Sequence, residues 1–80
     1  MDVQLYRKYL HQFVRDSIKR SNGTVNSIRE ELDIIQVGGL LSRHKTEKKR
    51  ALKDAQKAFD EHRHWPLQII LSHLGVEAPE

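Results

Sequence analysis

Apolar residues recur along this chain at intervals of three and four, and this period constrains the fold more than any other feature. Such spacing gathers apolar side chains on one face of an α-helix. Helix-breaking residues interrupt the period at Ser21-Asn22-Gly23, Gly38-Gly39 and Trp65-Pro66. With 80 residues the chain forms one domain, residues 1–80. We predict an all-α fold, a small bundle of about four helices near residues 3–20, 24–37, 46–64 and 66–74.

Capping residues mark where three of these helices begin. Asp2 precedes the first apolar residue and can accept hydrogen bonds from the first turn. Ser27 and Glu30 have the spacing of a capping box in the second helix, with Thr24 as the alternative cap. Thr46 is the expected N-cap of the third helix. These residues support the starts that the apolar period predicts.

Proline and glycine define the last helix. The residue before a proline avoids the α region, so Trp65 ends the third helix and Pro66 opens the fourth. Gly75 fits the position just after the fourth helix, with Val76 as its apolar contact. The apolar run 69–71 also suits a buried strand, but a single strand would have nothing to pair with. We therefore expect a short helix here.

Residue types that the sequence lacks exclude several classes of protein. The chain has no cysteine, which rules out disulfide scaffolds, thiolate metal sites and cysteine nucleophiles. No apolar stretch approaches the ~18 residues of a membrane span, so we expect no membrane partner. The start of the chain carries Asp2 and lacks the apolar core of a signal peptide. We expect a cytoplasmic protein.

No arrangement of residues predicts catalysis. The serines and glycines form neither a nucleophile elbow nor a phosphate-binding loop. Five histidines raise the question of a metal site, but helical ligand pairs are normally spaced i, i+4. His62 and His64 are spaced i, i+2 and point to different sides of a helix, although either could stack beside Trp65 on a base or ring. We expect a protein that is not an enzyme and uses no metal and no cofactor.

Basic residues are concentrated in two segments. Residues 1–20 carry five basic and two acidic side chains, and residues 43–65 carry eight and four. Residues 21–42 carry one basic and three acidic side chains, and the net charge of the whole chain is +3. This segregation favours a polyanionic partner over a uniformly solvated surface.

The second basic segment holds the candidate nucleic-acid-binding residues. Lys49, Lys53 and Lys57 are spaced i, i+4, i+8 and would share one face of the third helix. Such a face can neutralise successive phosphates and release their counterions. DNA is therefore the expected partner. The full candidate set is Arg43, Lys45, Lys48, Lys49, Arg50, Lys53 and Lys57.

The same segment has a second interpretation, as a solvated helix face with internal ion pairs. Arg50–Asp54 and Lys57–Glu61 have the i, i+4 spacing for it, each pair being worth ~0.3–0.5 kcal/mol. Lysines neutralised by the protein's own carboxylates would leave no surface for a polyanion. The number of free lysines in the folded chain decides between the two interpretations.

Residues 22–44 carry a pattern with an early turn, two apolar core positions and a basic end. The matching residues are Asn22, Gly23, Ile28, Leu32 and Ile34, followed by Arg43, His44 and Lys45. This pattern resembles the Fis-type helix-turn-helix, also seen in small phage regulators such as the NinH family. Arg29, Asp33 and Gly38-Gly39 depart from it. The resemblance implies a phage- or bacterial-type DNA-binding protein that regulates transcription, with the basic end near a groove.

A protein–protein interaction module is the alternative function. The third helix carries an apolar stripe over residues 51–59, and the helix 66–74 is also rich in apolar residues. As an adaptor, an inhibitor or a homodimer, the protein would use Phe59, Trp65, Ile69 and Ile70 as contacts. An exposed stripe favours this alternative. A buried stripe leaves the lysine face as the main candidate.

Overall fold

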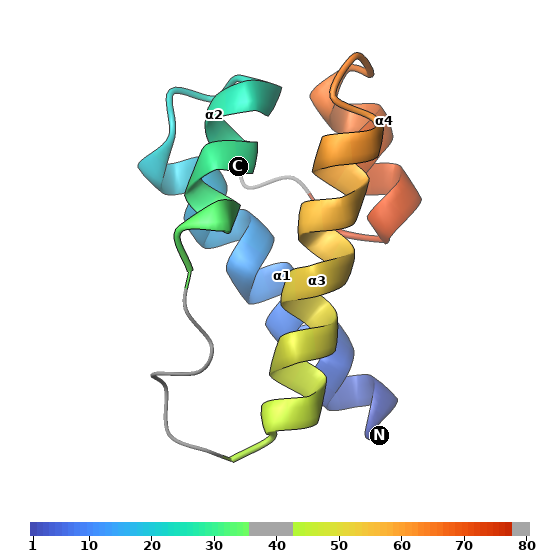
Figure 1. Ribbon diagram of the computed structural model, residues 1–80. Coiled ribbons are helices and arrows are strands. Elements are labelled where there is room, and N and C mark those ends of the chain that lie inside the picture. The colour runs from blue at the N-terminus through green and yellow to red at the C-terminus, as the bar shows by residue number, and fades with distance from the viewer. Residues whose placement is uncertain (36–42, 78–80) are drawn as a thin grey trace.

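The computed structural model describes residues 1–35 and 43–77 and is all-α. Its helices are α1 (Val3–Arg20), α2 (Val25–Asp33), α3 (Lys45–Glu61) and α4 (Leu67–Leu74) (Figure 1). No strand occurs in these two ranges. The predicted small helical bundle is therefore confirmed, and α1 has the predicted bounds.

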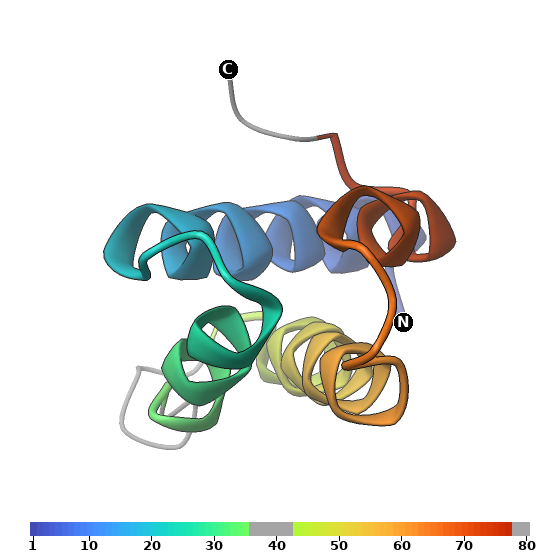
Figure 2. The ribbon, with the colours of Figure 1, turned by 90° about the horizontal axis from the view of Figure 1, so that it is seen from above.

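The four helices form two layers. Helix α1 runs across α2 and α3, which lie side by side against the same side of it (Figure 2). Helix α4 packs against α3 and lies in the layer of α1. Because α1 contacts both α2 and α3, the crossing of α1 over α3 is the centre of the fold.

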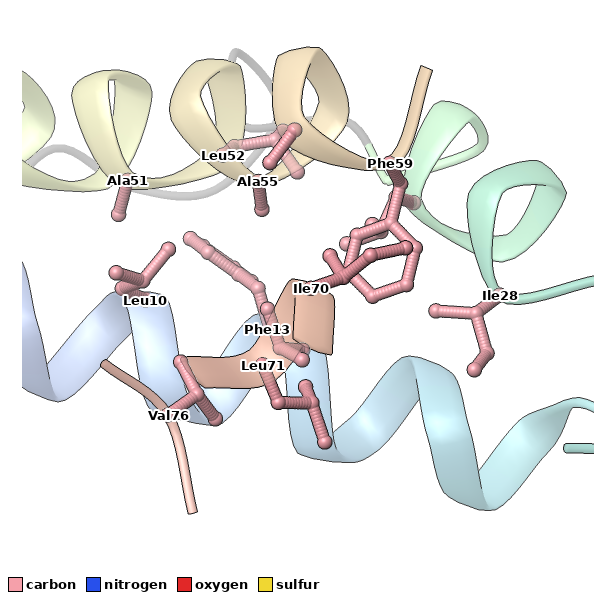
Figure 3. Close-up of a cluster of buried hydrophobic side chains, with 13 residues drawn as sticks. Leu10, Phe13, Ile28, Ala51, Leu52, Ala55, Phe59, Ile70, Leu71 and Val76 are labelled. Carbon is pink, nitrogen blue, oxygen red and sulfur yellow. The ribbon is translucent and has the colours of Figure 1, made fainter. Parts of the chain in front are cut away.

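The apolar stripe of α3 is buried in the core of this bundle. Ala51 and Ala55 face Leu10 and Phe13 of α1, and their small side chains let the two helices approach closely (Figure 3). Phe59 is 0% exposed and packs in the same cluster. The core comprises Leu10, Phe13, Val14, Ile28, Leu32, Ala51, Leu52, Ala55, Ala58, Phe59, Ile70, Leu71 and Val76. The other helices of the same chain thus cover the apolar stripe of α3.

The predicted caps of α1 and α2 are confirmed in part. The Asp2 carboxylate accepts hydrogen bonds from the backbone N–H groups of Gln4 and Leu5, as expected. In α2, Thr24 is the N-cap and accepts from the N–H of Ser27 at 3.2 Å. The capping box of Ser27 and Glu30 is therefore wrong, and the alternative cap is right. The Ser27 hydroxyl instead donates to the Thr24 carbonyl at 2.9 Å.

Helix α2 ends earlier than the predicted boundary at residue 37. Its last residue is Asp33. The Leu32 carbonyl accepts from the N–H of Ile35 at 3.3 Å, which is the three-residue spacing of a turn and not the four-residue spacing of an α-helix. The Gln56 side chain of α3 donates to the same carbonyl at 2.9 Å. The predicted stop at Gly38-Gly39 lies outside the described residues.

Helix α3 is displaced toward the N-terminus relative to the prediction. His44, with a φ of 61°, is its N-cap in place of Thr46, and Lys45 is its first residue. The helix ends at Glu61 rather than at residue 64, and the N–H of Trp65 donates to the His62 carbonyl at 2.8 Å in the turn that follows. A left-handed histidine is an uncommon cap, so propensity alone favoured the threonine.

The end of helix α4 agrees with the prediction. Gly75 adopts a φ of 73°, and the N–H of Val76 donates to the Leu71 carbonyl at 2.9 Å. Val76 is itself buried in the core. Pro66 is the N-cap rather than the first helical residue, so the helix starts one position later than predicted. The glycine end thereby turns the chain so that Val76 joins the core cluster.

Candidate functional site

The outward face of α3 presents three lysines from one continuous helix. Lys49, Lys53 and Lys57 are all exposed, as their spacing predicts. Within residues 1–35 and 43–77, none of the three forms an ion pair. The predicted pair Lys57–Glu61 is not formed, so this lysine is left to solvent.

The other four candidate residues occupy different environments. Arg43 and Lys45 are exposed at the start of α3. Arg50 is paired with Asp54 at 3.4 Å, which confirms that predicted ion pair. Lys48 does not share the outward face: it is half-buried, and its Nζ lies 5.2 Å from the centre of the Tyr9 ring of α1.

Carboxylates gather near the C-terminal half of the outward face. Lys53 and Lys57 line a shallow groove together with Asp33 and Asp60. Asp60 also binds Arg29 of α2 at 3.0 Å. Exposed cations therefore outnumber exposed carboxylates most clearly in the N-terminal half of α3.

Tyr6 joins α1 to the edge of this face. Its hydroxyl donates to Asp54 Oδ2 at 2.5 Å, and the same carboxylate lies 3.4 Å from Arg50. Burial, together with the hydrogen bond to Asp54, raises the pKa of Tyr6 to about 12. Sequence reasoning missed this contact because the two residues belong to different helices, 48 positions apart.

Three aromatic rings pack together where α3 meets α4. The His62 ring stacks on Trp65 with centroids 3.7 Å apart and planes 9° from parallel. His73 of α4 meets both rings edge-on, at 5.1 Å from His62 and 5.7 Å from Trp65. His62 therefore stacks on Trp65 of the same chain, and the stacking of these histidines on the ring of a bound base stays a prediction. In the described ranges no three potential metal-ligating residues come together.

The predicted protein-contact residues are divided between core and surface. Phe59 and Ile70 are fully buried, so their assignment as partner contacts is wrong: they hold the core together. Trp65 is half-buried and engaged with His62. Ile69 is 51% exposed and is the one residue of this set on the surface. Periodicity places apolar residues on one face of a helix, but it does not decide whether the same chain or a partner covers that face.

The residues that carry the helix-turn-helix resemblance are described only in part. Ile28 and Leu32 are buried, which agrees with their expected core positions. Ile34 is 66% exposed rather than packed after a turn. Residues 36–42, which would form most of the recognition helix, lie outside the described residues. The helix-turn-helix is not confirmed.

Comparisons with known proteins yield no relative: no family model, no curated protein and no solved structure matches this chain. The resemblance to the Fis-type family stays a prediction. Among the described helices, none has both the length and the apolar character needed to cross a membrane. The surface of the molecule itself is therefore the remaining guide to function.

Proposed function

We propose that this protein is a small non-catalytic nucleic-acid-binding regulator that binds DNA through the cationic face of α3. The observation that carries the proposal is the exposure of Lys49 and Lys53 on one continuous helix, without ion pairs in the described ranges. Each cation of such a face can neutralise one backbone phosphate and release a counterion. Phosphate contacts of this kind supply affinity and little sequence preference.

The closed core supports this choice over the protein–protein alternative. The apolar stripe of residues 51–59, on which that alternative depended, packs against α1 and α4. Ile69 is exposed on α4, and its neighbour Ile70 points into the core. The lysine face is therefore the better candidate for a binding surface.

Titration of fluorescently labelled duplex DNA by anisotropy tests the proposal. If five cations each bind one phosphate, affinity falls ~500-fold between about 50 mM and about 200 mM salt. The variant carrying both Lys49→Glu and Lys53→Glu is expected to abolish binding while its circular dichroism stays that of the parent.

A matched control separates the α3 face from net charge. Arg15→Glu with Lys19→Glu makes the same charge change at the same i, i+4 spacing on exposed positions of α1. We expect this variant to retain much more affinity than the α3 variant. The proposal fails if the parent protein does not bind DNA at about 50 mM salt, where phosphate contacts are strong. It also fails if both double variants lose the same affinity.

A further inference from the structure

A second group of cations lies where α1 crosses α3, around the ring of Tyr9. The Nζ of Lys8 lies 6.0 Å from the centre of this ring, and the Nζ of Lys48 lies 5.2 Å from it. The His44 ring is 6.2 Å away. Two helices that are far apart in the sequence thus bring basic side chains to a single half-buried phenol.

Within residues 1–35 and 43–77, ion pairs do not neutralise these cations. Neither Lys8 nor Lys48 forms an ion pair there. Glu47, the acidic residue in the first turn of α3, is 9% exposed, and its Oε2 is buried with no hydrogen-bond partner among the described residues. The surface beside Lys8 is lined by Gln4, Arg7 and His11, a set that adds one arginine, one histidine and no acid.

The opposite end of α3 mixes cations with carboxylates. Lys57 lies in the groove with Asp33 and Asp60, and Glu61 follows one turn later. A phosphate near Lys57 would meet repulsion from these carboxylates at the same time as attraction from the lysine. The favourable path for a polyanion therefore leads away from Lys57 and toward Tyr9.

We infer that the nucleic-acid backbone crosses the molecule at the α1–α3 crossing, from Lys45 and Lys49 to Lys48 and Lys8. It does not follow α3 along its whole length to Lys57. This inference rests on the proposed function and assigns α1 a part in binding that the spacing of the lysines on α3 does not predict. Lys8 and Lys48 bind phosphates, and Tyr9 holds the two lysines at a common place by packing beneath them.

Single charge-neutralising variants test this path by anisotropy with the same labelled duplex over a range of salt concentrations. Lys8→Gln and Lys48→Gln are each expected to lower affinity roughly tenfold at about 50 mM salt and to reduce the salt slope by about 1. Lys57→Gln is expected to leave both quantities near those of the parent. Lys48→Arg keeps the charge and should restore binding.

The control is Lys19→Gln, which removes one charge from an exposed position near the other end of α1. If Lys57→Gln costs as much affinity as Lys8→Gln or more, the inferred path is overturned while DNA binding by α3 stands. If Lys8→Gln and Lys19→Gln behave alike, α1 contributes only net charge and the inference is likewise overturned. If the parent protein does not bind at all, the proposed function falls first and the path falls with it.

Discussion

The inward and outward faces of α3 have the same helical geometry and opposite roles. The inward face consists of alanine, leucine and phenylalanine side chains that are buried against the other helices. The outward face carries lysines, and in the described part of the chain these lysines form no ion pair with another helix. The difference teaches that stability and binding are separable in this helix: substitutions on one face should affect folding, and substitutions on the other should affect affinity.

The largest effect is expected from Phe59→Ala on the inward face. Phe59 is completely buried, and its removal leaves a cavity in the centre of the core. We expect the free energy of unfolding to fall by ~3–5 kcal/mol, measured by urea denaturation. A loss below ~1 kcal/mol would mean that this face is not the core of the protein.

A smaller loss is expected when the inward face is overfilled. Ala55 is fully buried at the contact with α1, so Ala55→Leu must push the two helices apart. We expect a destabilisation of ~1–3 kcal/mol in the same denaturation experiment. The matched change Lys53→Leu on the exposed face serves as the control and should stay within ~0.5 kcal/mol. If the two substitutions lowered the free energy of unfolding equally, the inward and outward faces would not differ in their contribution to stability.

Tyr6→Phe probes the boundary between the two faces. The lost hydrogen bond to Asp54 should cost ~1 kcal/mol at neutral pH. The pKa of Tyr6 is raised from 10.0 to about 12 in the folded protein, so folding favours the neutral phenol. This part of the stability is complete below pH 10 and is lost as the pH rises toward 12.

The readout for Tyr6 is the difference in unfolding free energy between the parent and Tyr6→Phe as a function of pH. The difference should shrink between pH 10 and 12, and ultraviolet titration should place one phenol near the upper value. A difference that is constant across this interval would show that burial and the hydrogen bond to Asp54 do not hold Tyr6 in its neutral form.

The smallest effect on stability is expected from the outward face. Lys49→Gln with Lys53→Gln should change the free energy of unfolding by no more than ~0.5 kcal/mol, because both side chains are exposed and unpaired within the described residues. DNA affinity should nevertheless fall steeply. A large loss of stability would show that these lysines support the fold, and the comparison of the two faces would fail.

The fold could be predicted from the sequence wherever local rules decide it. The bounds of α1, the Asp2 cap and the left-handed Gly75 follow from period, capping and backbone preference. The start of α3 could not be predicted in this way, because His44 adopts a conformation that its residue type rarely takes. Local rules therefore predict where the helices lie, and they fail where a residue adopts a backbone conformation that is rare for its type.

The candidate site was predictable only as far as a single helix extends. The i, i+4, i+8 spacing correctly placed Lys49, Lys53 and Lys57 on one exposed face. It could not show that Lys48 turns toward Tyr9, since that contact depends on how α1 crosses α3. The burial of Ile70 next to an exposed Ile69 likewise depends on the docking of α4, which no spacing within the chain specifies.

The stacked pair of His62 and Trp65 gives this protein a built-in optical probe. Trp65 is the sole tryptophan of the chain, and its indole lies flat against an imidazole at 3.7 Å. Because His73 of α4 also meets this indole edge-on at 5.7 Å, its fluorescence emission reports on one corner alone, the joint between the third and fourth helices. Detachment of the last helix could be followed in real time, without a label, and distinguished from melting of the whole bundle by circular dichroism.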